Sequence, residues 1–210
     1  MTDSEKRVVY NIIKLEGTSN DPNEYLWLAH VANNQAKVRK KTLYELLMTG
    51  YSSVPSAQKV ELPDTNKNKN ANSARTAVDS VLAGALDPTG GARFWDGTDF
   101  LAWGLHNPSD KPHPKFRQYT SVSISDQIFK TYLNNNLARF RSGKVNYYGK
   151  IYKIPAAVFN EPKNWIPELV LPKKNLPINY VGKFYYKTDT GSQELIATGA
   201  NGQSIYWKVL

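Results

Sequence analysis

The chain of 210 residues contains no cysteine, and only three of its residues are histidine. The absence of cysteine excludes a disulfide scaffold, a cysteine-ligated zinc site and a thiol nucleophile. His30, His106 and His113 lack the paired spacing on one helix that a metal site uses, so we expect no metal and no cofactor. No segment approaches the ~18 consecutive apolar residues of a membrane span, so none is expected.

The N-terminus also lacks the features of a signal peptide. It is charged, beginning Met-Thr-Asp-Ser-Glu-Lys-Arg, and no long apolar run follows it. If the protein acts outside the cytoplasm, we therefore expect another export route or a leader beyond this sequence.

The composition is that of a folded, basic protein. Hydrophobic residues make up 40% and charged residues 21% of the chain, which is enough to build a core. The net charge of +9 favours a polyanionic partner, such as nucleic acid, anionic lipid or an anionic cell-wall polymer. Charge alone does not choose among them.

The first part of the chain has the pattern of a helix, a break and a second helix. Apolar residues recur at helical spacing over residues 4–15, with Ser4 as the expected N-cap. Gly17–Asn20 interrupt the periodicity. Asp21 is then the expected N-cap of a second helix that runs to Asn34, with Glu24 completing a capping box.

Glu16 lies between the first apolar helix and the break. Burial at such a position would raise the pKa of its carboxyl group, which suits a general acid. The alternative is a solvated glutamate at a frayed helix end, since carboxylates are mostly exposed.

Further elements follow up to residue 95. Thr42 and Glu45 form a second expected capping box, residues 63–72 are polar and predict an exposed loop, and helical periodicity returns over residues 73–85. Asp87–Gly91 then predict a turn in which the paired glycines adopt positive φ or approach a ligand closely, although this motif by itself favours a turn without function.

The second half of the chain predicts a different architecture. Residues 96–120 resemble a long structured loop, and Ser125 or Asp126 is expected to begin a helix. From Val145 onward the chain is rich in tyrosine and proline, and it ends in three expected strands, at residues 180–187, 193–197 and 204–209. Residues 199–202 are the expected turn between the last two. We therefore predict an α+β protein with a mainly helical domain at 1–144 and a β-rich extension at 145–210.

Residues 8 to 97 resemble the cell-wall hydrolases typified by spore-cortex-lytic enzymes. That family has a helix ending in a catalytic Glu and an Asn eighteen residues later, an interval that Glu16 and Asn34 keep. Its aromatic-Ser pair is matched by Tyr51 and Ser52, and its Asp-Pro-Thr-Gly-Gly-Ala segment by residues 87–92. The chain departs from the family at Gly17–Asn20, where the family has Ala-Arg-Gly-Glu, and at Gln35, where a basic residue is common.

The resemblance implies a lysozyme-like, mainly helical domain that cleaves the glycan strands of peptidoglycan, commonly as a lytic transglycosylase. Glu16 would be the catalytic acid and then base. A hydrolytic muramidase or glucosaminidase would need a second carboxylate, and Asp21 and Glu24 are better explained as capping groups. The resemblance further implies a substrate-binding cleft lined by Asn34, Tyr51, Ser52, Asp87, Thr89, Gly90 and Gly91, with Phe94 or Trp95 stacking on a sugar ring.

Two non-enzymatic readings remain open. One is a basic module that binds nucleic acid or the cell wall, using the basic residues at 37–41 and tyrosines on strands. No RRM, KH or zinc-finger pattern supports nucleic-acid binding. The other is an adaptor with a lysozyme-like fold and no activity.

The resemblance also bears on localisation and partners. A wall-degrading enzyme without a leader is expected at the bacterial wall or periplasm, either as a phage endolysin released on lysis or as an injected antibacterial toxin effector. Residues 145–210 would then bind the wall, a carrier of the delivery apparatus or an immunity protein.

Overall fold

The computed structural model describes residues 1–49, 51, 53–54, 68–97, 119–141, 145–147, 150–152, 183–187 and 193–210. Within them the protein combines helices with a small sheet, so the α+β class and the helical N-terminal part are confirmed. The chain forms two compact units, one of Met1–Trp95 with Asn201–Tyr206 and one of Asp96–Ala200 with Trp207–Leu210. These bounds differ from the predicted 1–144 and 145–210. The prediction used a change in composition along the chain, and composition cannot show that Asn201–Tyr206 packs with the first helices.

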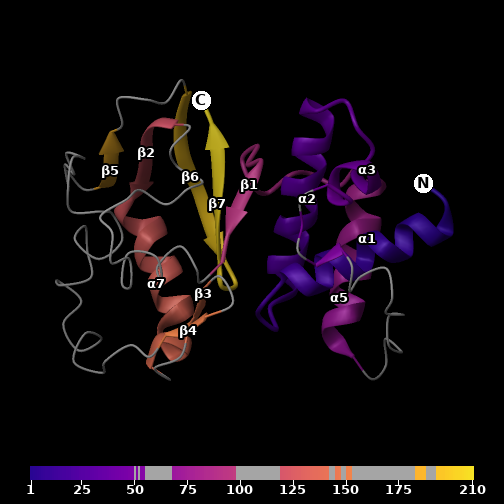
Figure 1. Cartoon of the computed structure of the whole chain (residues 1–210), viewed down its shortest axis with the longest axis horizontal. Helices are drawn as coiled ribbons and strands as arrows, with labels where there is room; N and C mark the ends of the chain where they lie inside the picture. Colours follow the sequence, from indigo (N-terminus) through magenta and orange to yellow (C-terminus); the bar gives the residue numbers. More distant parts are fainter. Residues whose placement is uncertain are drawn as a thin grey trace. The chain divides into compact units, whose positions relative to one another are not determined.

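The first unit is built on four helices, which Figure 1 shows in indigo to magenta: α1 (Asp3–Glu16), α2 (Pro22–Val38), α3 (Leu43–Leu47) and α5 (Lys69–Leu82). The prediction that Ser4 caps α1 is wrong. Thr2 is the N-cap and forms a capping box with Glu5, which satisfies two backbone N–H groups at the helix start.

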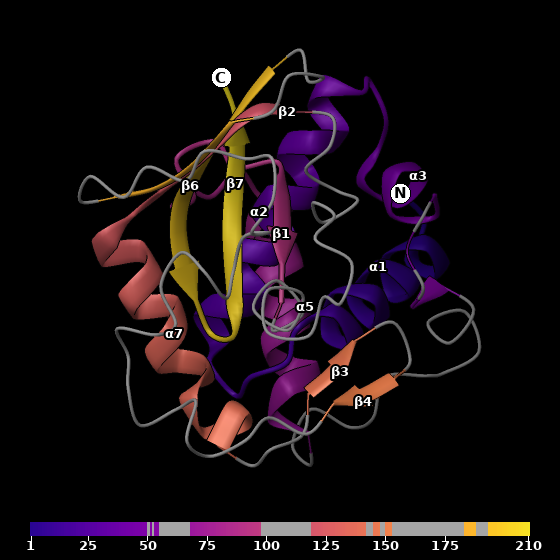
Figure 2. The same ribbon diagram turned by 60° about the vertical axis from the view of Figure 1, so that its left-hand side comes forward.

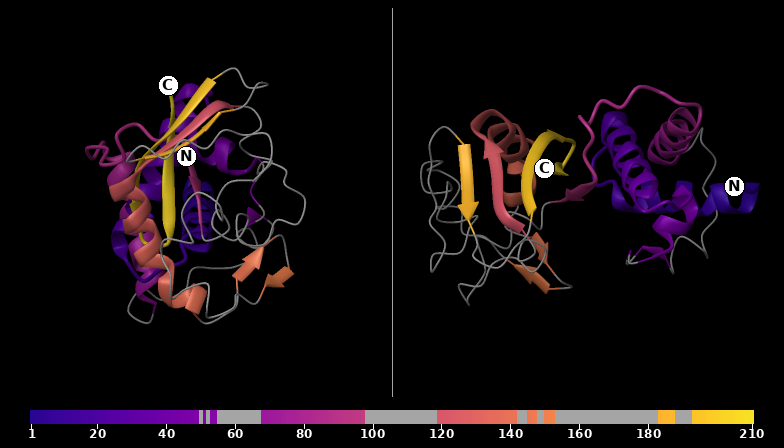
Figure 3. Two further views of the ribbon diagram at one scale, coloured as in Figure 1. Left: turned by 90° about the vertical axis from the view of Figure 1, so that its left-hand side faces the viewer. Right: turned by 90° about the horizontal axis from the view of Figure 1, so that it is seen from above.

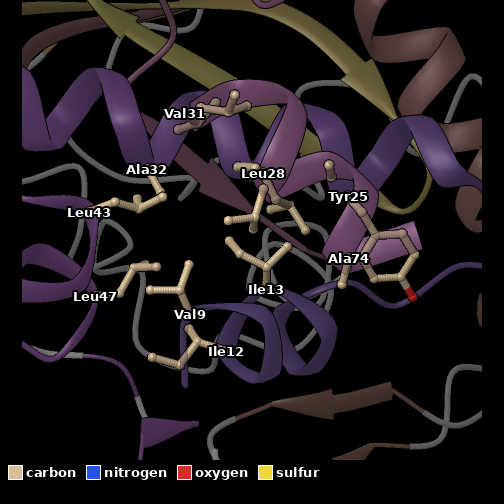
Figure 4. Packing of buried hydrophobic residues seen from close by; sticks show 14 of the residues in the cluster. Val9, Ile12, Ile13, Tyr25, Leu28, Val31, Ala32, Leu43, Leu47 and Ala74 are labelled. Atoms are coloured by element: carbon tan, nitrogen blue, oxygen red, sulfur yellow. The ribbon is translucent and has the colours of Figure 1, made fainter. Parts of the chain in front are cut away.

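The core of this unit lies between the apolar faces of these helices. Val9, Ile12 and Ile13 of α1 are fully buried; Ile13 points toward Leu28 of α2, and Val9 lies beside Leu47 of α3 (Figure 4). Burying each such aliphatic side chain contributes about 1.5–3 kcal/mol. The cluster fixes the two helices that carry Glu16 and Asn34.

The boundary between the expected loop and the helix after it lies earlier than predicted. The helix expected from residue 73 begins at Lys69, because the side chain of Asn68 caps it by accepting from the amide of Ala71. Residues 69–72 are therefore helix and not loop, while residues 55–67 lie outside the described part. The expected capping box at Thr42 and Glu45 is present.

A five-stranded sheet has the order β1 (Phe94–Asp96), β7 (Ser204–Val209), β6 (Gln193–Asn201), β2 (Tyr119–Ser125) and β5 (Lys183–Lys187). β2 pairs antiparallel with β5 and parallel with β6. β6 and β7 run in opposite directions (Figure 2). Strands were expected in all three C-terminal segments, but β6 continues to Asn201, so the turn comes at residues 202–203 and not 199–202.

The helix of the second unit, α7 (Asp126–Arg141), packs beside β2 (Figure 3). Ser125 caps it by accepting from the amide of Ile128. Among the α7 residues whose burial the structure describes, Phe129, Tyr132 and Asn136 are buried, at helical spacing along one face. A separate pair of short strands, β3 (Val145–Tyr147) and β4 (Lys150–Tyr152), is antiparallel. Among the described helices none is long and apolar enough to cross a membrane.

Candidate active site

Glu16 is the last residue of α1, and the residue after it leaves the helix. Gly17 has extended backbone angles, and its amide donates to the carbonyl of Ile13 and so closes the last turn. The side chain of Glu16 is partly buried. Ser53 donates a hydrogen bond from its Oγ to Oε1 of Glu16 at 2.7 Å.

Ser53 was not among the predicted site residues, because the family resemblance matched Ser52 to the serine of the aromatic-Ser pair. Ser52 lies outside the described residues, whereas its neighbour donates to the candidate acid. The signal that could have found Ser53 was weak, because two adjacent serines follow Tyr51 and the motif does not distinguish them.

Tyr51 lies within electrostatic range of the Glu16 carboxylate, and its ring stacks on that of Trp95. Tyr51 and Trp95 stack with their centroids 5.4 Å apart and their planes at 21°. Burial raises the pKa of the Tyr51 hydroxyl, and the negative charge of Glu16 raises it further. Tyr51 is therefore a neutral hydrogen-bonding group at physiological pH, within electrostatic range of the carboxylate. The structure thus brings together Glu16, Tyr51 and Trp95 from three separate segments.

Asn34, by contrast, holds the Asp87–Ala92 turn in place. Its Nδ2 donates to Oδ2 of Asp87 at 2.8 Å and to the carbonyl of Ala92 at 3.0 Å. These bonds span more than fifty residues of sequence. The side-chain amide thus links the end of α2 to both ends of the turn.

The turn is also held by its own hydrogen bonds. Asp87 accepts from the amide and hydroxyl of Thr89 at 2.8 and 2.6 Å, and from the amide of Gly91 at 3.2 Å. Burial acts to raise the pKa of Asp87, but the bonds from Thr89 and Asn34 outweigh it and hold the pKa below its usual value. Gly90 and Gly91 adopt the expected positive φ, at 66° and 82°.

The polar atoms of the turn that were predicted to bind substrate are therefore used to build the turn. Thr89 is 1% exposed, and both its hydroxyl and its amide are engaged. Phe94 is half-buried and lies 6.0 Å from the guanidinium of Arg93, at the outer limit of a cation–π contact. The geometry favours a role for the turn in placing Trp95, three residues after Ala92.

His30, on α2, is a buried residue. Its side chain is 3% exposed, its Nδ1 lies 3.9 Å from Oδ1 of Asp87, and its Nε2 makes no hydrogen bond within the described residues. Burial lowers the pKa of His30, while the charge of Asp87 opposes this effect. The imidazole is therefore neutral at pH 7.

The prediction that Glu24 completes a capping box with Asp21 is wrong. Asp21 does cap α2, accepting from the amide of Asn23 at 2.9 Å. The carboxylate of Glu24, however, accepts from Thr18 and Ser19 of the preceding loop and from Gln203 and Ser204 near the C-terminus. The spacing from Asp21 fits a cap, and no local pattern indicates the partners near the C-terminus.

A hollow of about 690 Å³ lies near the start of α1, away from Glu16. Lys6, which lines it, precedes Glu16 by ten residues, or roughly 15 Å along the helix. The described residues contain no group of three or more His, Asp or Glu side chains placed to hold a metal ion.

Comparison with protein-family models, curated proteins and solved structures gives no match for this chain. The resemblance to cell-wall hydrolases is therefore carried by the residues themselves.

Proposed function

We propose that this protein has a lysozyme-like catalytic domain and cleaves the glycan strands of peptidoglycan as a lytic transglycosylase, with Glu16 as its acid and base. One observation carries the proposal. A partly buried carboxylate at the end of an apolar helix is bound by the Ser53 hydroxyl and lies beside the stacked pair Tyr51 and Trp95.

The reaction needs one carboxylate in two roles. Protonated Glu16 donates its proton to the glycosidic oxygen as the bond from C1 of N-acetylmuramic acid breaks. The Glu16 carboxylate then accepts the proton of the same sugar's 6-hydroxyl, whose oxygen forms the new bond to C1. The products are a 1,6-anhydro sugar and a strand with a free 4-hydroxyl, and Glu16 regains its proton.

The neighbouring carboxylates favour this route over hydrolysis, which would need a second carboxylate as nucleophile or base. Asp21 caps α2. Glu24 is fully buried and accepts several hydrogen bonds, and Asp87 accepts hydrogen bonds from within its own turn. Each of the three has a structural partner, so none is placed as an obvious second catalyst.

The aromatic pair supplies a surface for a sugar ring. Tyr51 and Trp95 are each partly exposed, and a pyranose presents C–H groups that pack on aromatic faces. The net charge of +9 favours approach to an anionic wall.

The test is digestion of purified peptidoglycan by the wild type and by Glu16→Gln, with mass spectrometry of the products. Anhydromuramyl ends that are present with the wild type and absent with the variant support the proposal. Reducing ends would indicate a muramidase or glucosaminidase on the same domain. No cleavage by folded wild type would leave a wall-binding or adaptor role.

A further inference from the structure

A single buried carboxylate, that of Glu24, ties the loop after Glu16 to the turn near the C-terminus. Glu24 is 0% exposed. On the loop side it accepts from the amides of Thr18 and Ser19 at 3.1 and 2.7 Å and from the Thr18 hydroxyl at 3.3 Å. On the other side it accepts from the amide of Gln203 at 3.1 Å and the hydroxyl of Ser204 at 2.9 Å. Every one of these partners is a donor, which suits an ionised carboxylate.

The turn is shaped to approach this carboxylate closely. Gly202 has φ of +56°, and a Cβ there would lie 2.5 Å from Cδ of Glu24. Only glycine both adopts this conformation without strain and leaves space for the carboxylate. Tyr206, which follows in β7, belongs to the core of the first unit, and its ring lies 5.0 Å from that of Trp27. The last strand therefore contributes to the packing of α2.

The loop is equally constrained at its start. A Cβ on Gly17 would lie 2.3 Å from the ring of Tyr25, which is 1% exposed and has no room to move. The Tyr25 hydroxyl donates to the carbonyl of Ser19 at 2.9 Å. Glu16 is bonded directly to Gly17, so the place where the loop is held sets the place where α1 ends.

We propose that Glu24 is a positioning residue for Glu16, and that the C-terminal turn Gly202–Ser204 is a working part of the catalytic unit. The positioning role rests on the proposed function. The turn and the loop both donate to the Glu24 carboxylate. If the turn is displaced, the Glu24 side chain loses the bonds that hold it on that side. Its bonds to the amides of Thr18 and Ser19 then weaken, and the end of α1 shifts. A shift of about 1 Å at a catalytic group can cost on the order of 100-fold in rate.

Two variants of the full-length protein test the proposal. Glu24→Gln keeps the size of the side chain but places an NH₂ group against N–H and O–H donors. Ser204→Ala leaves Glu24 intact and removes one donor from the turn alone. Val78→Ala is the matched control, because Val78 is a fully buried core residue of α5 and makes no contact with the loop that the structure records.

The first measurement is hydrogen exchange of the peptide that contains Thr18 and Ser19, and it does not depend on activity. We expect slow exchange in the wild type and in Val78→Ala, at least tenfold faster exchange in Glu24→Gln, and a smaller increase in Ser204→Ala. Equal exchange in all four proteins would overturn the link between the turn and the loop.

The second measurement is glycan cleavage at a temperature where all the variants are folded. We expect kcat of Glu24→Gln to fall by about tenfold or more, with KM within about twofold and a shifted alkaline limb of the pH profile, which reports Glu16. Val78→Ala should keep the wild-type kcat and pH profile. A Glu24→Gln enzyme that behaves like Val78→Ala would overturn the positioning role. Absence of cleavage by the wild type would instead refute the proposed function and with it the positioning role, and the exchange result would still decide whether Glu24 links turn and loop.

Discussion

Two carboxylates eight residues apart flank the loop Gly17–Asn20, and they are placed in opposite ways. Glu16 ends α1, is partly exposed and meets a serine hydroxyl beside two stacked rings. Glu24, in the first turn of α2, is wholly buried, and its hydrogen bonds come from the preceding loop and from a segment near the C-terminus. A buried carboxylate that accepts from several donors stabilises the fold, whereas a partly exposed one can exchange a proton with a ligand. The contrast assigns Glu24 to the fold, and we propose the chemical role for Glu16.

The largest effect on stability is expected from Glu24→Ala. The change removes the acceptor of the buried Ser204 hydroxyl and of the half-buried amides of Ser19 and Gln203, and each group left unsatisfied costs about 1–3 kcal/mol. We expect the free energy of unfolding to fall by at least about 3 kcal/mol, measured by denaturant titration. A loss below about 1 kcal/mol would mean that water replaces the carboxylate, and the contrast with Glu16 would not hold.

Gly17→Ala probes the same loop from its other end. The new methyl group would overlap the buried Tyr25 ring, and overpacking of this kind costs about 1–3 kcal/mol. Gly84→Ala is the control, because Gly84 has φ of +86° but open space around it, so only backbone strain of about 1 kcal/mol is expected. Glycan cleavage should fall in Gly17→Ala and remain in Gly84→Ala. The reverse pattern would contradict a fixed loop.

Asp21→Ala removes the acid that does cap α2. The bond to the amide of Asn23 is local, so we expect a loss of about 1 kcal/mol in thermal unfolding, well below that of Glu24→Ala. If the two losses were equal, Glu24 would contribute no more than an ordinary cap.

The smallest effect concerns His30 and pH. Because the pKa of His30 is lowered in the folded protein, the unfolded chain binds more protons below its usual pKa of 6.5. Stability is therefore fully present above pH 6.5 and falls as the pH drops from there toward the lower pKa of the folded state. His30→Gln should reduce this slope in urea titrations at pH 7 and pH 5. An unchanged slope would assign the dependence to other groups.

The sequence predicted local features well and distant ones poorly. The helix ending at Glu16, the Asp21 cap and the positive φ at Gly90 and Gly91 follow from spacing and residue type within a few positions. Two partners of Glu24, Gln203 and Ser204, lie about 180 residues away, and no local pattern encodes them. A glutamate three residues after Asp21 fits the pattern of a capping box. The pattern therefore predicted a local role for Glu24 and not its hydrogen bonds to the C-terminal turn.

The candidate site shows the same limit. The family resemblance indicated Glu16, Tyr51 and Trp95, and the structure places Tyr51 within electrostatic range of Glu16 and stacked on Trp95. The bond from Asn34 to the turn and the bond from Ser53 to Glu16 depend on how the helices pack. Hydrophobic spacing specifies which faces pack but not which polar atoms then meet.

The most direct test of the account uses Glu16→Gln and the wild type, with glycan-strand cleavage and unfolding free energy measured on the same samples. The amide oxygen still accepts from Ser53, so the unfolding free energy should change by less than about 1 kcal/mol. The amide cannot transfer the proton, so cleavage should fall by about 10²–10⁴-fold and anhydro ends should disappear. A variant that is equally stable and still cleaves the glycan at the wild-type rate would contradict the assignment of Glu16 as the acid.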